Sequence, residues 1–377
     1  MSIGKRKNLV TEKVAEAMWE LLTKLMSILR WSTYIADYRF NELNKQALNA
    51  TIAYFLAVEA KEAGHKIDLT RFPKIIINRV FEKMFLCDIR EDYVEKVLKD
   101  GNIKRERFDE IIAEEIRELM GEDFARFIHI GRDWEETRIF QGATKIATKM
   151  EIEQIKSTIH QKDFMMVQDE IGEMLNEYND LPGFARISLD YSKEMNIFRQ
   201  ISALRNRIRW QKWLGAVPCS VLGHNFEVAI FSYLMALKKY GDEEIATKCF
   251  FIGVFHDVPE TFTGDMPSPV KDAIPGLRKA TEFFELEMME EHIYSKLPGY
   301  LSEAIHMVMM EEYEQEEYKP LIKQADWLSA DFECLRQIIA GSRDKYFVEV
   351  LKRDLSEEGK FDELFGNMLR KIAQEVL

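Results

Sequence analysis

Residues 249–272 read CFFIGVFHDVPETFTGDMPSPVKD, a stretch in which an apolar helical segment ends at the adjacent pair His256 and Asp257. An imidazole and a carboxylate held together at the end of a buried helix suit a divalent metal ion. The pair alone has low specificity, because a His-Asp dipeptide is more often a surface pair or a hydrogen-bonded core histidine. A metal site therefore requires further ligands from other parts of the chain.

Two more candidate ligands lie on predicted helices before and after this stretch. His224 begins the amphipathic segment HNFEVAIFSYLMAL, and Asp326 lies within KQADWLSADF. A helical bundle can bring one ligand from each of several helices to a single interior point. His224 and Asp326 are therefore candidates to complete a site with His256 and Asp257.

Helical periodicity dominates the whole chain. Segments such as 14–29 (VAEAMWELLTKLMSIL), 46–60 (QALNATIAYFLAVEA) and 108–120 (FDEIIAEEIRELM) place apolar residues three and four positions apart, with charged residues between them. Alternating β-branched patterns, which are typical of strands, are nearly absent. The sequence predicts an all-α fold, with the turn-rich segment 177–185 as the best candidate for a domain boundary.

A weak internal repeat relates the two halves at an offset of about 175 to 180 residues. The matching segments keep one order: Arg30-Trp31 with Arg209-Trp210, 47–57 with 226–236, 78–88 with 252–262, and 145–155 with 323–333. This common order favours a tandem duplication. The alternative is a pair of unrelated helical domains.

The composition is that of a folded protein without a nucleic-acid or membrane partner. Apolar residues make up 46% of the 377 residues, and the formal net charge is −13. An acidic chain disfavours broad binding to nucleic acid or to an anionic membrane. No long apolar run is present, and the four separate cysteines are typical of reduced core thiols. We expect a cytoplasmic protein, in which a bound metal ion makes the site of an anionic substrate locally cationic.

Three segments resemble the bacterial 5′-deoxynucleotidases of the HD superfamily of metal-dependent phosphohydrolases: 209–210 (RW), 256–271 (HDVPETFTGDMPSPVK) and 323–341 (KQADWLSADFECLRQIIAG). The resemblance covers roughly residues 196–350, and its ordered motif ExxTGDxPxPVK is far more specific than His-Asp alone. It implies that one divalent cation is ligated by His224, His256, Asp257 and Asp326. This mixed ligand set does not choose among Mn, Co, Zn, Fe, Ni and Mg.

The resemblance also implies roles for residues around the cation. Glu260 would transfer protons, so that it and the ligand Asp257 are the candidate catalytic residues; otherwise Glu260 is a solvent-facing residue. Asp265 would contact the substrate, or else cap the next helix. Arg209 would hold the phosphate through its planar fork of donors, or else belong to an ordinary basic helix face. Trp210 would pack against sugar or base, or else belong to the core.

The chain departs from the family beside the first metal histidine. Family members commonly have serine there, whereas this chain has Gly223 before His224 and Asn225 after it. Ligation remains intact, but the contacts on the substrate side are placed in doubt. His292 and His306 lie on further helical segments, and we expect neither to be a ligand.

The N-terminal half keeps no such ligand set. Under the repeat alignment the four ligand positions fall on Lys45, Glu82, Lys83 and Thr148. Two ammonium groups would repel a cation, so we expect no metal of this kind in residues 1–180. This half would be a degenerate HD-like domain, packed as a pseudo-dimer against the HD phosphohydrolase domain of residues 190–377. It would serve as a scaffold, or as a regulatory pocket if Lys45 and Lys83 bind an anion.

The favoured function is removal of the 5′-phosphate from nucleoside monophosphates, with deoxynucleotides preferred. One alternative keeps the metal site but hydrolyses nucleoside triphosphates, cyclic nucleotides or alarmones. Another is a nucleotide-sensing protein without turnover. The partner in each case is a small nucleotide, bound by a monomer with an internal pseudo-dimer or by a homo-oligomer.

Overall fold

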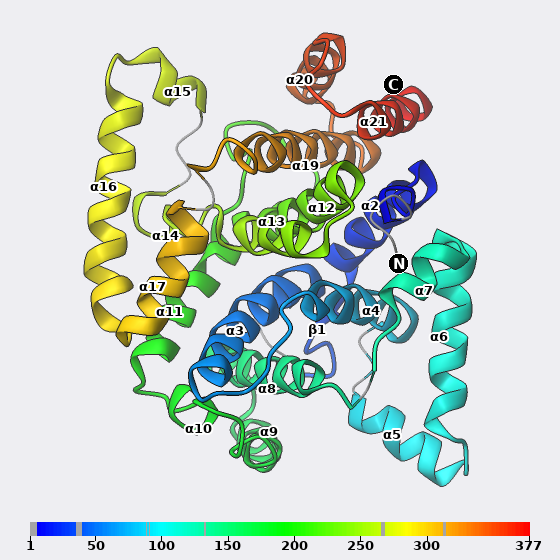
Figure 1. The fold of residues 1–377 in the computed structure, drawn as a ribbon, viewed down its shortest axis with the longest axis vertical. Helices are drawn as coiled ribbons and strands as arrows, with labels where there is room; N and C mark the ends of the chain where they lie inside the picture. The colour runs from blue at the N-terminus through cyan, green and yellow to red at the C-terminus, as the bar shows by residue number, and fades with distance from the viewer. Residues whose placement is uncertain are drawn as a thin grey trace.

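The computed structural model describes residues 6–34, 40–87, 89, 91–131, 133–264, 268–311 and 314–377. Helices dominate these ranges (Figure 1). The strands found there form one antiparallel pair of two residues each, β1 (Leu29–Arg30) and β2 (Phe40–Asn41). The prediction of an all-α fold is confirmed.

The first half is built around α3, a long helix that is buried on almost every side because its residues are largely apolar or small. Its N-cap is Asn41, whose side chain accepts the N–H of Asn44 at 2.9 Å. The helices of this half are α2 (Glu12–Ser27), α3 (Glu42–Glu62), α4 (Arg71–Leu86), α5 (Glu91–Asp100), α6 (Arg105–Met120), α7 (Glu122–Ile128), α8 (Glu135–Ile155) and α9 (Gln161–Asn176).

The second half is built around α12 and α13, which are joined by a short turn at Gly241 and Asp242. Gly241 ends α12 in the left-handed conformation, and the Asp242 side chain caps α13. The elements of this half are α10 (Phe184–Ile187), α11 (Lys193–Ser202), η1 (Ala203–Asn206), α12 (Val221–Tyr240), α13 (Glu243–Phe255), α14 (Glu260–Thr263), α15 (Ser268–Ala273), α16 (Leu277–His292), η2 (Tyr294–Lys296), α17 (Gly299–His306), the π-helical turn η3 (Met307–Glu311), α19 (Lys319–Ile339), α20 (Lys345–Ser356) and α21 (Glu363–Val376).

One apolar core runs through both halves. From top to bottom, Figure 1 shows α19, then α12 with α13, then α3 with α4, then α8, and neighbouring layers pack together. Aromatic rings cross the junction: Tyr54 of α3 lies 4.6 Å from Phe251 of α13, and Trp19 of α2 lies 5.4 Å from Phe332 of α19. The division into two domains, and their origin by duplication, stay predictions beside this continuous core.

Close packing of α12 on α13 depends on Gly253. A Cβ added there would lie 2.5 Å from the backbone Cα of Ala229, which cannot move aside as a flexible side chain would. We expect Gly253→Ala to lower the free energy of unfolding by about 1–3 kcal/mol, as overpacking usually does. Denaturant titration checks this value. Gly172→Ala is the matched control, since Gly172 on α9 has nothing within 4 Å of an added Cβ; equal effects of the two substitutions would contradict the packing argument.

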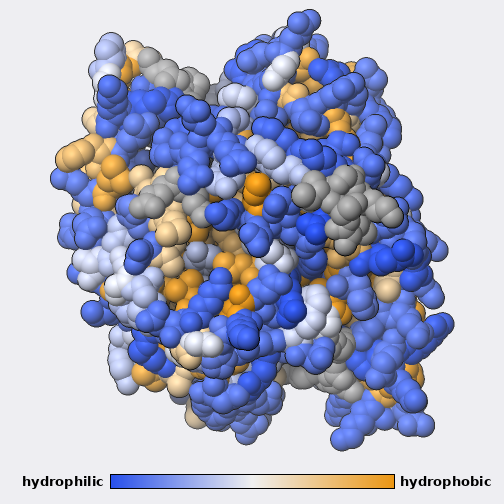
Figure 2. Space-filling view, in the orientation of Figure 1, coloured by the Kyte–Doolittle hydropathy of each residue, from blue (hydrophilic) through white to orange (hydrophobic). Residues whose placement is uncertain are grey.

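The face drawn in Figure 2 is mostly hydrophilic, with apolar residues in scattered patches. In the described part of the chain, no helix is both long enough and apolar enough to cross a bilayer. All four cysteines are free, but the expectation that they are core thiols is wrong for Cys87, which is exposed where α4 ends.

Candidate metal and active site

His224 owes its position to the start of α12. The Ser220 hydroxyl caps this helix by accepting the N–H of Gly223 at 3.1 Å. His224 follows in the first turn, and its side chain is buried between α12 and α19. The capped start of α12 therefore fixes the position of the His224 imidazole in the interior.

His256 and Asp257 lie where α13 stops. The helix ends at Phe255, and His256 is its C-cap. Residues 256–259 form turns, and α14 starts at Glu260 immediately after Pro259. The helix is thus interrupted before Glu260, as Pro259 favours, and the Glu260 N–H donates to the Asp257 carbonyl at 3.0 Å. The turn keeps the two candidate ligands and Glu260 in one compact segment.

The structure brings all four predicted ligands together. His224 Nε2 lies 3.1 Å from Asp326 Oδ1 and 3.9 Å from Asp257 Oδ2. His256 Nε2 lies 3.2 Å from Asp257 Oδ1 and 3.9 Å from Asp326 Oδ1. Ligand atoms of His224, His256 and Asp257 all lie within 4.8 Å of one another. Two imidazole nitrogens and two carboxylates from three separate segments therefore face one small space.

The chemistry of this space fits a divalent cation. His256 Nε2 is buried and has no hydrogen bond, which is costly unless another group occupies the site. Burial lowers the pKa of His256, so that its neutral, metal-binding form is favoured. Burial and Arg209 also lower the pKa of His224, but hydrogen bonds to Asp326 and Glu333 outweigh them and raise it to about 9. The carboxylates thus favour a positive charge where a cation would bind.

A buried polar network holds His224 in one orientation. Its Nδ1 lies 3.0 Å from Ser329 Oγ and 3.4 Å from a Glu333 oxygen. The Ser329 hydroxyl donates to Glu227 at 2.8 Å, so it accepts from Nδ1–H of His224. In the neutral form of His224, the Nε2 lone pair therefore faces the site. Arg336 completes the network with an ion pair of 2.6 Å to Glu227.

The same region carries the similarity to known proteins. A family model described as YfbR-like 5′-deoxynucleotidase matches residues 196–361. A 5′-deoxynucleotidase of Vibrio parahaemolyticus is 30% identical over 156 residues, which make up 40% of this chain and 79% of that protein. The chain belongs to the YfbR-like 5′-deoxynucleotidase family. Relatives named 5′-deoxynucleotidase in Yersinia pestis and Yersinia pseudotuberculosis are 29% identical over 153 residues, 40% of this chain and 77% of each relative. The predicted resemblance is confirmed for the C-terminal half.

Arg209 and Trp210 lie beside the ligands of this YfbR-like site. Arg209 Nε donates to Glu333 at 3.0 Å, and its Nη1 lies 3.9 Å from Asp257 Oδ2. Trp210, in the left-handed conformation with φ 66°, donates from Nε1 to the same Glu333 oxygen at 2.5 Å. Its ring also packs against aromatic residues, among them Phe347. The contacts of both residues with substrate stay predictions.

The remaining candidates have different surroundings. Asp265 lies outside the described residues. His292 stacks on Phe262 at 5.0 Å, and His306 meets the ring of Tyr294 at 5.1 Å. Among the described residues, the group of possible metal ligands contains neither histidine, and their exclusion as ligands stays a prediction.

The unusual residues beside His224 have a structural explanation. A Cβ added at Gly223 would lie 3.0 Å from Leu43 Cδ2 of α3, so glycine lets the two halves approach here. With its amide oriented to donate, the Asn225 nitrogen lies 3.3 Å from Asp257 Oδ2. Gly223 therefore serves the junction with the N-terminal half, and Asn225 supports a candidate ligand.

Glu333 tests the importance of the network. Glu333 accepts hydrogen bonds from Arg209 and Trp210 and lies 3.4 Å from His224 Nδ1. Burial raises the pKa of Glu333, but the charge of Arg209 and the contact with His224 outweigh burial and lower this pKa to about 2. We expect Glu333→Gln to reduce kcat/KM for phosphate release by about 10–100-fold, the usual cost of losing an outer-shell partner. A matching loss of metal affinity in calorimetry would identify it as a positioning residue. Glu349→Gln, at an exposed position of α20, is the control; equal activity of both variants would contradict the role.

Proposed function

We propose that this protein is a metal-dependent phosphomonoesterase that removes the 5′-phosphate from deoxynucleoside monophosphates. The observation that carries the proposal is the convergence of His224, His256, Asp257 and Asp326 within one space of the family-matched region. The names of the relatives supply the reaction and the substrate class.

These four residues would hold one divalent cation. When bound, such a cation supplies positive charge that polarises a phosphoryl oxygen and lowers the pKa of a water molecule. Asp326 is suited to present Oδ1 to it, because its Oδ2 accepts from Lys323 at 2.8 Å. Asn225 would similarly orient Asp257.

The neighbouring residues would bind the phosphate and move the protons. Arg209 lies next to Asp257, so its guanidinium is placed to neutralise phosphate oxygens beside the cation. Glu260 begins α14 directly after the ligand turn, and it would take a proton from the attacking water. Trp210 and Asp265 would select the sugar, with Trp210 excluding a 2′-hydroxyl by its bulk.

Phosphate release from a panel of deoxy- and ribonucleoside monophosphates, each with Mn, Co, Zn, Fe, Ni or Mg, tests this function. We expect turnover by the parent protein, a preference for 2′-deoxy sugars, and loss of turnover in Asp257→Ala. Nucleoside triphosphates, cyclic nucleotides and alarmones belong in the same panel. Release of triphosphate or pyrophosphate, or of a linear monophosphate from a cyclic nucleotide, in place of phosphate from the monophosphates would contradict the proposed substrate class. Binding without turnover under any metal would indicate a nucleotide sensor. A cytoplasmic location and the number of chains in the assembly stay predictions.

A further inference from the structure

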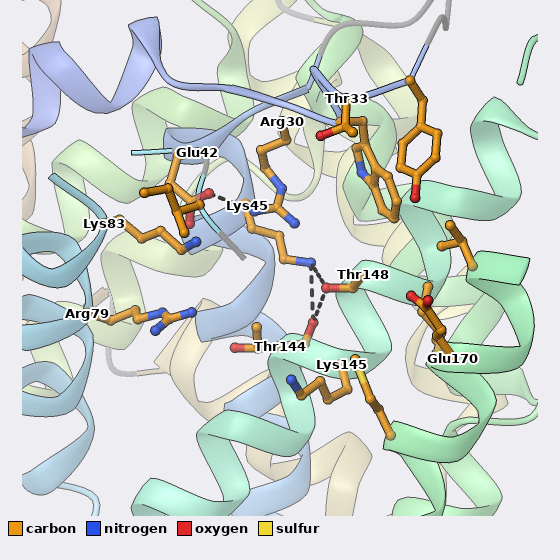
Figure 3. A pocket seen from close by; sticks show the side chains of 16 residues that line it. Arg30, Thr33, Glu42, Lys45, Arg79, Lys83, Thr144, Lys145, Thr148 and Glu170 are labelled. Carbon is orange, nitrogen blue, oxygen red and sulfur yellow. Dashed lines mark hydrogen bonds and ion pairs between the residues drawn. The ribbon is translucent and has the colours of Figure 1, made fainter. Parts of the chain in front are cut away.

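A cavity lies in the N-terminal half, among the β1–β2 segment, α3, α4, α8 and α9 (Figure 3). The cavity has a volume of about 130 Å³. Five cationic side chains line it against two carboxylates, Glu42 and Glu170, although the chain as a whole is acidic. The cations are Arg30, Lys45, Arg79, Lys83 and Lys145.

Lys83 and Lys145 differ from the other cations of the cavity in lacking a paired side chain among the described residues. Arg30 is paired with Glu42 at 2.8 Å and with Glu151 at 3.0 Å, and Arg79 is paired with Glu82 at 2.5 Å. Lys83 and Lys145, by contrast, have neither a hydrogen bond nor an ion pair with any residue in the described ranges. Figure 3 shows the Lys83 and Lys145 nitrogens directed toward the space that Lys45 also enters.

Lys83 makes the cavity suited to an anion. Its side chain is only 6% exposed, so its charge is largely removed from water. Burial, and then the positive charge of Arg79, lower its pKa to about 8. A buried ammonium group without a close partner is unfavourable, and an anion placed beside it would restore the missing interaction.

The cavity is built like the candidate active site of the other half. Arg30 Nε and Trp31 Nε1 both donate to Glu151 at 3.0 Å, as Arg209 and Trp210 do to Glu333. Both tryptophans are left-handed, with φ 64° and 66°. Lys45 Nζ lies 3.6 Å from Glu151, where His224 Nδ1 lies 3.4 Å from Glu333.

This correspondence adjusts one pair of the repeat alignment. Matching Glu151 to Glu333 gives an offset of 182 (333 − 151), which sets Asp326 opposite Thr144 (326 − 182) and not opposite Thr148. Lys45 donates to both the Thr144 carbonyl, at 3.2 Å, and the Thr148 hydroxyl, at 2.7 Å. Lys45 thus takes the place of the candidate ligand His224, and it contacts Thr144, which takes the place of the candidate ligand Asp326.

The walls of the cavity indicate what the anion is attached to. Trp31 and Tyr34 lie on one side, with ring centroids 6.0 Å apart, and apolar residues of α9 lie on another, among them Ile171 and Met174. Flat aromatic faces accept a nucleobase, while the lysines accept phosphate oxygens. We propose that this cavity binds a nucleoside phosphate without a metal ion and without hydrolysing it, as a second site separate from the candidate active site.

Calorimetric titration in EDTA tests the proposal on full-length Asp257→Ala protein, which removes turnover and the cation while leaving the cavity intact. The probes are the 5′-monophosphates and 5′-triphosphates of the four deoxynucleosides, with inorganic phosphate for comparison. We expect one binding site for at least one nucleotide, bound at least about tenfold more tightly than phosphate. Adding Lys83→Met should weaken it by about tenfold or more, since a charged hydrogen bond to the phosphate is lost.

Two further variants keep the test decisive. Lys145→Met removes the other unpaired charge from a half-buried position and should weaken binding in the same way, whereas Lys99→Met, at an exposed position of α5, should not. Lys83→Met should also raise the melting temperature, because an apolar side chain replaces a buried charge. Absence of binding by every nucleotide, equal binding of phosphate, or binding unchanged by both lysine variants would overturn the proposal. None of these outcomes depends on whether the C-terminal site is catalytic.

Discussion

Asp326→Asn is expected to reduce kcat/KM for phosphate release by more than about 100-fold. Loss of a residue that only supports a metal ligand costs up to about 100-fold, and loss of a ligand itself should cost more. Asparagine keeps the shape of the side chain but removes the charge that lies 3.1 Å from His224 Nε2. Asp326 is also the one candidate ligand on α19, so the variant tests the contribution of that helix to the site while the other three candidate ligands remain. Steady-state phosphate release measures the first effect, and calorimetric titration with Mn measures the loss of cation affinity.

The matched control is Asp180→Asn. Asp180 is exposed and forms an ion pair with Arg138 at the surface, so this change should leave activity within about threefold of the parent, as expected for a surface ion pair. If Asp326→Asn were equally active, Asp326 would not be a ligand. The site would then consist of the tighter group formed by His224, His256 and Asp257.

Arg336→Leu is expected to lower the free energy of unfolding by about 3–5 kcal/mol, because it would leave Glu227 buried without its partner. Both side chains of this ion pair are at most 4% exposed, and their closest atoms are 2.6 Å apart. Arg336 also donates from Nε to Thr23 of α2 at 2.9 Å, so the substitution removes a link between the halves as well. Equilibrium urea denaturation gives the value.

Two comparisons isolate the buried charge. The double variant Glu227→Leu with Arg336→Leu removes both charges, and its stability should recover much of the loss. Arg343→Leu, at an exposed position just beyond α19, should change stability by less than about 0.5 kcal/mol. A double variant as unstable as Arg336→Leu would show that lost packing, and not the unpaired carboxylate, dominates.

The four candidate ligands could be proposed from the sequence because two of them are adjacent within a motif that resembles a known family. His256 and Asp257 are adjacent at the end of an apolar helix, and Pro259 marks where that helix must stop. His224 and Asp326 each lie on a segment whose spacing of apolar residues predicts a helix. The all-α fold follows from the same periodicity, which persists through most of the chain.

The supporting residues could not be found in this way, because their roles depend on which helix faces meet. Ser329 and Glu333 follow Asp326 by one and two turns of α19, and Glu227 follows His224 by one turn of α12. These spacings were readable, but only the crossing of α12 and α19 turns them into one hydrogen-bonded network. The need for glycine at position 223 could not be predicted either, because it arises from the close approach of Leu43 on α3, which is far away in the chain.

α3 packs against α12, the helix that carries His224, and both helices belong to the same polypeptide chain. Ser220, which caps α12, donates to Asn44 at 2.6 Å, and Gly223 packs on Leu43. Where separate subunits supply such a surface, dilution separates them. Here both surfaces belong to one polypeptide, so their effective concentration is set by the chain and not by the amount of protein. The shape of the site should therefore be independent of protein concentration, even in a cell that holds only a few copies.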